Sequence, residues 1–290
     1  MTTSLHPYIS KFDEGFDVGK TQEEYRIAIQ FTLGGFSYLI MDAGTNAIGA
    51  MESYLSDDLT DEKDIFNTFE KALALNKLNG KKFQSVTCII GNRNYALIPN
   101  ELFDEKESSK YLGFLHTIPQ NTLILNDNLS ENECHGIYSV SNCLIEKIKG
   151  IWPDAKIVHE SSIFLRHITK VANLFATTRV YVYVKNRSFD MAIFKNGNLS
   201  FFNNFKFNTK DDFLYFLMFA IEQQKMSADE TSVCVSGMIL GNSEIMKLCE
   251  RYIKDIRFIK NGDTIKVSEA LKEIPSQYYY IPYQVLQCES

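Results

Sequence analysis

The sequence has 290 residues, of which 45% are hydrophobic and 23% charged, and its formal net charge is −6. This balance is that of a soluble globular protein with enough chain for one large domain or two ordinary ones. The acidic charge argues against the basic surface that binding to a phosphate backbone requires, so we expect no nucleic-acid partner.

The N-terminus and the apolar runs predict a cytoplasmic protein. Residues 1–24 are polar and acidic, without the apolar core of a signal peptide, and we expect a leader without regular structure. The longest apolar run, Phe213–Ile221, is too short to cross a bilayer, and we expect it to pack in the core. The cysteines form no CxxC pair, and Cys88 and Cys234 lie in strand-like runs, which favours free thiols in a reducing compartment.

The first half of the chain predicts three antiparallel strands, a helix and a buried strand. Gly34-Gly35 and Ala43–Asn46 are the small, Gly- and Asn-rich segments that reverse the chain between strands, and Asp61 can cap the helix. The strands are expected at Tyr25–Phe31, Phe36–Met41 and Ala47–Tyr54, the helix at Asp61–Leu78 and the buried strand at Val86–Ile90.

The segment 92–139 is less regular and reads as an insertion. Within it we expect strands at Tyr95–Ile98, Thr122–Leu125 and Gly136–Val140 and a helix around Ser108–His116. A helix at Asn142–Trp152, a strand at Lys156–His159 and a helix at Ser162–Phe175 are expected to follow.

The second half repeats the order of the first in a clearer pattern. Asn196-Gly197 is a strong signal for a tight hairpin, and Thr209 with Asp212 forms a helix-capping pair. The expected strands are Val180–Val184, Phe189–Phe194, Leu199–Phe205, Ser232–Val235 and Ile256–Ile259, and the expected helices are Asp211–Gln224 and Ser243–Ile253. For the tail we expect a weaker helix at Val267–Ile274 and an extended Tyr-rich end at Tyr278–Leu286.

When Phe36 is aligned with Phe189, the strand patterns of the two halves of the sequence match. Each half then continues into a predicted helix and a buried strand that ends in glycine. The fold class is therefore α/β with mixed sheets, in two duplicated domains. The first domain is expected at 25–165 and the second at 166–290, after the leader at 1–24.

The order of three antiparallel strands, a helix and a strand resembles the ribonuclease H-like plan, and two such units in tandem resemble the actin-like ATPase superfamily. Four short motifs also resemble those of an uncharacterised bacterial family, of unknown function, that is assigned to this fold. The motifs are LIP at Leu97–Pro99, IVHE at Ile157–Glu160, FD at Phe189-Asp190 and the closing CE at Cys288-Glu289.

In this superfamily ATP lies between the halves, the first hairpin turn of each half wraps the phosphates, and an Asp entering the turn positions the metal ion. Glycines are needed there because only a backbone without Cβ approaches a phosphate closely enough. Here the second turn reads Lys-Asn-Arg-Ser at 185–188, and Gln30 and Tyr183 replace the two acids. The resemblance thus implies a vestigial nucleotide cleft with Gly34, Gly35, Ser188, Asp190 and Gly237, and no bound cofactor.

A second register keeps a phosphate loop. IMDAGT at Ile40–Thr45 matches the superfamily's first loop, with Asp42 orienting the metal ion and Gly44 and Thr45 contacting phosphate. ATP and magnesium would then be the cofactors. This register leaves one strand too few before the helix, so the duplicate favours the first register, and the second stays open.

Other chemistry has little support in the sequence. His159 and His167 are separated by seven residues, whereas the metalloprotease spacing is three, so we expect no metal site.

The main hypothesis is a non-catalytic pseudo-ATPase that acts as a cytosolic scaffold or interaction protein with an unknown protein partner. The alternatives are a nucleotide-binding ATPase or kinase and a small-ligand-binding protein that uses the interdomain cleft.

Overall fold

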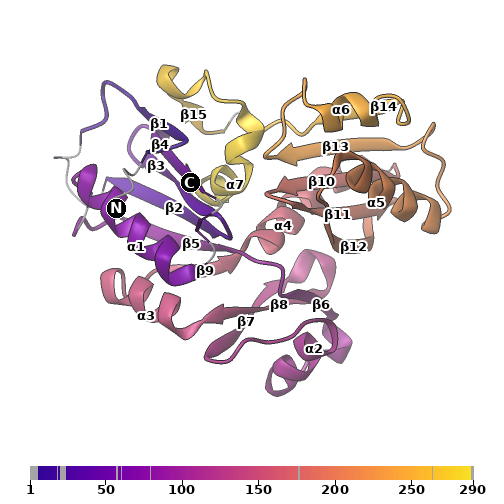
Figure 1. The fold of residues 1–290 in the computed structure, drawn as a ribbon, viewed down its shortest axis with the longest axis horizontal. Helices are drawn as coiled ribbons and strands as arrows, with labels where there is room; N and C mark the ends of the chain where they lie inside the picture. Colours follow the sequence, from indigo (N-terminus) through magenta and orange to yellow (C-terminus); the bar gives the residue numbers. More distant parts are fainter. Residues whose placement is uncertain are drawn as a thin grey trace. The chain divides into compact units, whose positions relative to one another are not determined.

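The structure, a computed structural model, describes residues 6–17, 19, 24–56, 58–59, 61–78, 80–175, 177–262 and 264–288. The chain folds into two compact units, and each is built around a mixed sheet (Figure 1). The first contains Met1–Ile163, Gly262–Ile274 and Ile281–Ser290, and the second contains Phe164–Asn261 and Pro275–Tyr280. The first division lies close to the expected boundary at 165, whereas the last two segments of the first unit fall within the expected second domain.

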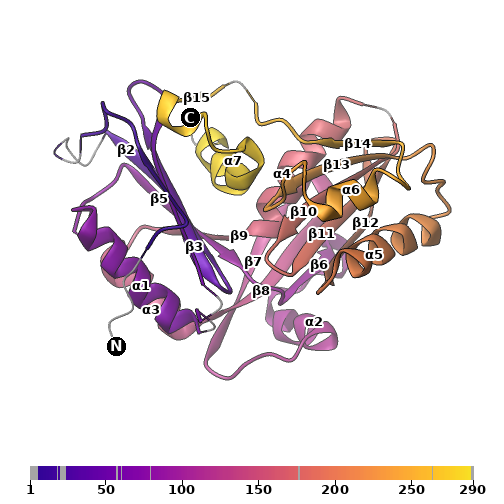
Figure 2. The ribbon, with the colours of Figure 1, turned by 45° about the horizontal axis from the view of Figure 1, so that its top comes forward.

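The main sheet of the first unit has the order β1-β4-β3-β2-β5-β9, with β15 paired to β4. The strands are β1 (Ile9–Phe12), β2 (Tyr25–Thr32), β3 (Gly35–Asp42), β4 (Ala47–Leu55), β5 (Ser85–Gly91), β9 (Lys156–His159) and β15 (Lys266–Val267). β2, β3 and β4 are antiparallel, while β2, β5 and β9 are parallel. Helices α1 (Glu62–Leu75) and α3 (Asn142–Ile151) cover one face of this sheet, and α7 (Tyr280–Cys288) lies on the other (Figure 2).

Strand β1 corrects the expected leader. It pairs with the sheet edge at β4, and a buried carboxylate, Glu52, holds it there. The donors to Glu52 are Ser10 Oγ at 2.8 Å, Tyr38 OH at 2.8 Å, Tyr54 OH at 3.2 Å and Asn76 Nδ2 at 2.7 Å. A four-residue edge strand is too short for a periodicity signal. Residues 1–5, 18 and 20–23 of the expected leader lie outside the described residues, as does Glu289 of the CE motif.

The insertion forms a sheet of its own, in the order β6-β8-β7. Its elements are β6 (Tyr95–Pro99), α2 (Ser108–Leu115), β7 (Thr122–Leu129) and β8 (Cys134–Ser141). Ala96, Leu112 and Ile137 are buried between the helix and the sheet. The small core is sufficient to order this segment, although its sequence pattern is irregular.

The second unit repeats the central order of the first, with a sheet arranged β12-β11-β10-β13-β14. Its elements are β10 (Arg179–Lys185), β11 (Ser188–Lys195), β12 (Asn198–Lys206), α5 (Lys210–Gln223), β13 (Ser232–Gly237), α6 (Glu244–Cys249) and β14 (Asp255–Phe258). The predicted tight hairpin is confirmed, and Asn196 and Gly197 have φ values of 52° and 82°, the positive values that a type I′ turn requires. The predicted capping pair is confirmed, because Thr209 and Asp212 form a reciprocal capping box.

Successive side chains of β10 lie on opposite faces of the sheet in the second unit. Val180, Val182 and Val184 enter the core formed with α5 and α6, and Tyr181 and Tyr183 point to the opposite face. On α5 one face is buried, but Tyr215 and Phe219 are 61% and 44% exposed. The expectation that the whole apolar run packs in the core is therefore wrong for its outer face.

The tail differs from its expected structure. Val267–Ile274 contains β15 and a single 3-10 turn at Glu269–Leu271 instead of a helix. The Tyr-rich end is helical, with a 3-10 turn at Ser276–Tyr279 followed by α7. The tyrosine and β-branched side chains of α7 are buried in the protein, so tertiary packing overrides their intrinsic preference for strands. Pro282 lies in the first turn of α7, where a helix tolerates proline.

His167 in α4 (Glu160–Asn173) gives the second unit a pH-dependent stability. Burial, with a smaller effect of the Lys170 ammonium, lowers the pKa of His167 to about 4, and the ring shares a hydrogen bond with the Tyr280 hydroxyl. The unfolded chain takes up this proton near pH 6.5 and the folded chain only near pH 4, so stability falls as pH drops through this window. We expect a loss on the order of 3 kcal/mol. Denaturant titrations from pH 7 to pH 4 should show a shallower loss for His167→Gln, and parallel curves for the two proteins would contradict the assignment.

Candidate functional site

The two first hairpins occupy the same place in the two units. In the first, Thr32 pairs with Gly35 and leaves a two-residue turn; in the second, Lys185 pairs with Ser188 in the same way. Each hairpin is followed by one further strand and a helix, and its first strand pairs in parallel with the strand after that helix. The observed register therefore aligns Gly35 with Ser188, and Phe36 with Phe189, as the duplication predicted.

The backbone at these turns is engaged within its own unit. Gly34 donates its N–H to Leu59 O at 2.8 Å, and its carbonyl accepts from Ser56 N at 2.8 Å. In the second unit Arg187 O accepts from Phe207 N at 3.1 Å. In each unit the partner residues lie in the connection between the third strand and the following helix. A phosphate-binding loop instead directs several N–H groups at the ligand, so the Gly34 amide is already committed.

The retained glycines are explained by strand packing. A Cβ on Gly35 would lie 1.9 Å from Tyr54 O, and one on Gly237 would lie 2.0 Å from Val184 O. Gly237 also has a φ of +96°, which side chains rarely adopt. Both positions require glycine whether or not a nucleotide binds.

Ser188 and Asp190 are buried on β11, and Asp190 forms a closed charge pair. Lys185 Nζ lies 2.9 Å from Asp190 Oδ2, with the two side chains 10% and 1% exposed. Asn204 Nδ2 donates to Asp190 Oδ1 at 2.7 Å. The charge of Lys185, at the start of the turn, is thus balanced by a carboxylate of the same unit.

Neither acid position holds an acid. Tyr183 is buried, and its ring packs against Phe164 and Tyr280 with centroid distances of 5.7 and 6.4 Å. In the first unit Gln30 donates from Nε2 to Glu160 Oε2 at 2.7 Å. A ring and an amide are poor ligands for magnesium, which prefers carboxylate oxygen and water.

The alternative loop lies at the other end of its hairpin. Asp42 ends β3, and Thr45 N donates to Asp42 Oδ1 at 2.8 Å, which makes a local turn with exposed Gly44. Gly35 begins the same strand, about 23 Å away for an eight-residue strand. The turn of Asp42, Gly44 and Thr45 corresponds to Asn196-Gly197 in the second unit, and the structure does not bring it to Gly34 or Gly35.

A buried polar cluster around the IVHE motif had no assigned role in the sequence. His159 and Glu160 are fully buried at the junction of β9 and α4. His159 Nε2 lies 3.1 Å from Asn92 O, its backbone N–H donates to Asp127 Oδ2 at 2.9 Å, and Tyr95 stacks on its ring. The histidine is therefore a satisfied core residue. Glu160 adds a buried carboxylate beside Gln30. In the sequence, the IVHE motif was the only indication of this buried cluster.

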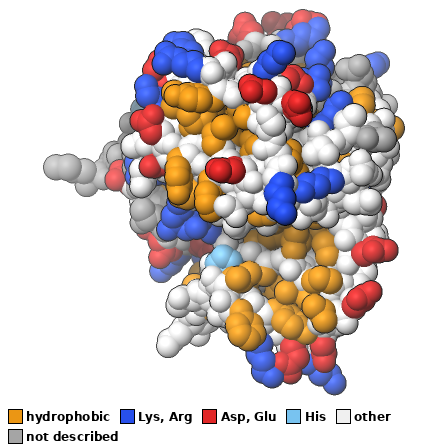
Figure 3. All heavy atoms as spheres, turned by 90° about the vertical axis from the view of Figure 1, so that its right-hand side faces the viewer, with side chains coloured by type: hydrophobic (Ala, Val, Ile, Leu, Met, Phe, Trp, Pro, Cys, Tyr) orange, Lys and Arg blue, Asp and Glu red, His pale blue; other side chains and the backbone are white. Residues whose placement is uncertain are grey.

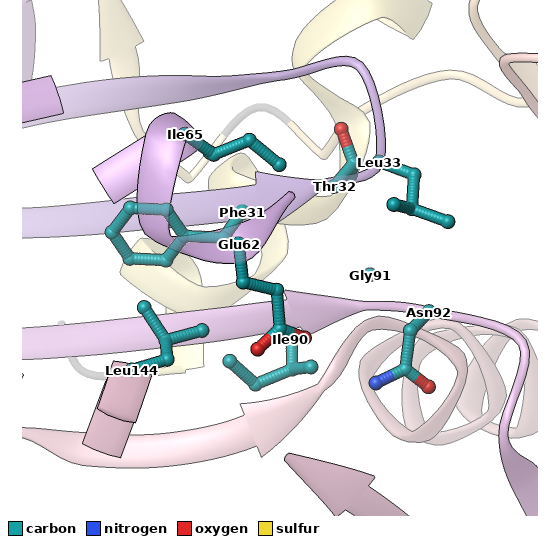
Figure 4. Close-up of a pocket in the computed structure, with 9 residues that line it drawn as sticks. All are labelled: Phe31, Thr32, Leu33, Glu62, Ile65, Ile90, Gly91, Asn92 and Leu144. Atoms are coloured by element: carbon teal, nitrogen blue, oxygen red, sulfur yellow. The ribbon is translucent and has the colours of Figure 1, made fainter. Parts of the chain in front are cut away.

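A pocket lies on the α1 and α3 side of the first sheet, where β2 and β5 end (Figure 4). We call it the Glu62 pocket. Its empty volume is about 320 Å³, and it is lined by Phe31, Thr32, Leu33, Glu62, Ile65, Ile90, Gly91, Asn92 and Leu144. Most of these side chains are apolar, and the charge comes from Glu62 at the start of α1.

A metal cluster and a membrane-spanning helix are both absent from the described residues. No group of three or more His, Cys, Asp or Glu side chains among them could hold a metal ion. No helix in that part of the chain is long and apolar enough to cross a membrane.

Comparison with known proteins places the fold. A family model described as "Protein of unknown function (DUF3822)" matches residues 14–256. A Bacteroides thetaiotaomicron protein "with actin-like ATPase fold and unknown function" has a TM-score of 0.77 at 16% identity, covering 92% of this chain and 97% of that one. A chain of the "PilM-PilN type IV pilus biogenesis complex" has a TM-score of 0.56 at 10% identity, covering 92% and 97%. No curated protein matches. The fold is that of the actin-like ATPases.

Proposed function

We propose that this chain, which belongs to the family described as "Protein of unknown function (DUF3822)" and has the actin-like ATPase fold, is a non-catalytic cytosolic scaffold or interaction protein. The observation that carries the proposal is the second hairpin turn. There Lys185 is buried and paired with Asp190, in a turn without glycine, where a phosphate loop would lie.

Electrostatics at the two turns supports this role. Phosphoryl transfer depends on a metal ion and on donors arranged around the transferring group. The two acid positions hold Gln30 and Tyr183, the Gly34 amide is bonded to Leu59 O, and the nearest ammonium is neutralised by Asp190. These replacements support a role without phosphoryl transfer at either turn.

Exposed hydrophobic side chains support an interaction role. Figure 3 shows hydrophobic side chains gathered at the bottom of the view, over the α2 side of the insertion. Phe114 and Leu115 of α2 are 86% and 67% exposed, and Leu102 close by in the chain is 67% exposed. Exposed apolar patches of this kind often mark protein contacts. The structural neighbour from the PilM–PilN complex is an example of this fold within a protein assembly.

Calorimetric titration with ATP and magnesium tests the proposal. We expect no saturable heat at millimolar nucleotide, because the two acid positions hold Gln30 and Tyr183 and the Lys185 ammonium is paired with Asp190. Saturable binding at micromolar nucleotide would contradict it. If binding were seen and were lost in Asp42→Ala but kept in Asp58→Ala, an exposed acid of the same unit, the nucleotide-binding alternative with Asp42, Gly44 and Thr45 would replace it.

A further inference from the structure

The outer edge of the second sheet is uncovered at the place where the first sheet carries an extra strand. β12 is the last strand in the order β12-β11-β10-β13-β14, and no described strand pairs with its outer side (Figure 1). In the first unit the corresponding strand is β4, and β1 pairs with it in the antiparallel direction. Ala50–Tyr54 of β4 are all buried, whereas none of the nine residues of β12 is buried.

The duplication also shows how the backbone of this edge is oriented. Strand pairing aligns Asn204 of β12 with Ser53 of β4, because their partners on the middle strands correspond. Ser53 O accepts from Tyr8 N at 2.7 Å, so Ser53 directs its backbone toward the added strand. Asn204 has the same orientation, and its N–H donates to Asn203 Oδ1 at 2.8 Å. A pairing strand would replace this local bond.

The side chains of β12 suit an edge that takes a further strand. Residues 198–205 carry no charge, although charged side chains are the common protection of an exposed sheet edge. Three of these residues are phenylalanines that are only partly buried: Phe201, Phe202 and Phe205. Asn203 is exposed, whereas Glu52 at the corresponding position of β4 is buried and holds β1. A strand added at β12 would therefore bury apolar surface.

Aromatic side chains continue from this edge onto α5. The Phe205 ring lies 6.4 Å from that of Phe201 and stacks on Phe216 at 5.4 Å. Tyr215 meets Phe216 at 5.3 Å and stacks on Phe219 at 5.9 Å. We call these five side chains the aromatic strip. Its outer members, Tyr215 and Phe219, are 61% and 44% exposed, and contiguous exposed apolar surface of this kind commonly marks an interface.

The first unit has no counterpart of this strip. Helices α1 and α5 both have 14 residues and begin after the N-caps Asp61 and Thr209. Counted from these caps, the positions of Tyr215, Phe216 and Phe219 are occupied in α1 by polar residues: Asn67, Thr68 and Lys71. The unit whose edge is covered by β1 thus has a polar helix side, and the unit with the uncovered edge has an aromatic one. This contrast between the duplicates indicates an interface at β12 and α5.

We infer that this interface binds a second copy of the chain, with β12 paired antiparallel to β12 across a two-fold axis. Such pairing requires a strand that is compatible with its own reversed sequence. With Asn203 at the axis, Phe201 faces Phe205 of the second copy, and the two rings form a cross-strand aromatic pair. Lys206, the first charge after the uncharged stretch, lies beside Ser200, so no like charges meet along the paired strands.

The same symmetry brings the two α5 helices together. A two-fold axis perpendicular to the sheet keeps both helices on one face, so the aromatic strips of the two copies meet above the paired strands. One strand pair and one helix contact make a small interface, and we expect a reversible dimer with a dissociation constant in the micromolar range. Dimer formation does not depend on whether nucleotide binds, so the inference goes beyond the proposed function.

Sedimentation equilibrium of the full chain, from low-micromolar to near-millimolar protein, tests the inference. Asn203→Lys places like charges at the axis and should weaken the dimer roughly threefold or more. Asn203→Val removes the acceptor that occupies the Asn204 amide and should tighten the dimer. Ser227→Lys, the same change of charge at an exposed position of the same unit, should leave the dimer unchanged.

A second pair of variants tests the aromatic strip. Phe219→Gln should weaken the dimer roughly tenfold, because each copy loses one ring from the interface. Tyr252→Gln removes another aromatic side chain of the same unit, 54% exposed, and should leave the dimer unchanged. The denaturation midpoints of these variants should stay close to that of the wild type, since the replaced side chains are exposed.

Hydrogen exchange identifies the strand that pairs. A higher protein concentration should slow exchange of the β12 amides and leave those of β14, the opposite edge of the same sheet, unchanged. A chain that stays monomeric at near-millimolar protein would overturn the inference. So would a dimer that Asn203→Lys and Phe219→Gln do not weaken, or one that protects β14 instead of β12. Nucleotide calorimetry can be repeated on Asn203→Lys, so failure of this inference and failure of the proposed function are distinguishable.

Discussion

Replacing Asp190 with alanine is expected to destabilise the second unit by about 3–5 kcal/mol, because it leaves the ammonium of Lys185 buried without its counter-charge. Asn204 also loses its acceptor, since its amide donates to Asp190 Oδ1. Chemical denaturation should show a lower midpoint with an unchanged slope, the signature of lost stability within a two-state transition.

Two variants separate this pair from ordinary surface charge. The double variant Lys185→Met with Asp190→Leu should recover most of the loss, because apolar side chains of similar size replace both charges. Glu244→Ala should have little effect, since Glu244 pairs with Lys210 and Lys247 at the surface. If Asp190→Ala were as stable as the wild type, Lys185 would reach solvent in the folded chain and could serve as an anion-binding group, which would weaken the proposed function.

Replacing Gly237 with valine is expected to cost about 3 kcal/mol or more. A Cβ at this position would lie 2.0 Å from Val184 O, and the backbone φ of +96° is unfavourable for any side chain. The strands β10 and β13 would have to separate at their ends, where Val184 pairs with Gly237. The loss should appear in the denaturation midpoint in buffer without nucleotide.

Gly241 provides the matched control. It follows in the same loop, and a Cβ there would meet only Phe258 Cε2, at the ordinary contact distance of 3.4 Å. Gly241→Ala should therefore stay close to the wild type. A Gly237→Val protein of normal stability would contradict the packing explanation. It would then favour a ligand-binding role for this glycine.

The strand-and-helix order was predictable because the chain repeats it. Hydrophobic alternation and turn residues such as Asn196-Gly197 predicted each strand of the duplicated hairpins, and the duplicate aligned Gly35 with Ser188, as the strand pairing does. β1 and α7 were missed for opposite reasons. β1 is too short to show a period, and α7 is built from residues with a preference for strands that become helical because they are buried.

The chemistry of the site was less predictable than its position. The sequence showed that KNRS lacks glycine, but the burial of Lys185 against Asp190 depends on the pairing of β10 with β11. Gln30 and Glu160 meet although they are 130 residues apart in sequence. The Glu62 pocket forms where the ends of β2 and β5 meet the start of α1. Contacts between such distant residues leave no local pattern.

A crystal structure determined after soaking with magnesium and a non-hydrolysable ATP analogue tests the central claim most directly. We expect no nucleotide at the turn of Leu33-Gly34 or at that of Asn186-Arg187, with Lys185 still paired with Asp190. A triphosphate bound at either turn, with a metal ion beside Gln30 or Tyr183, would contradict it.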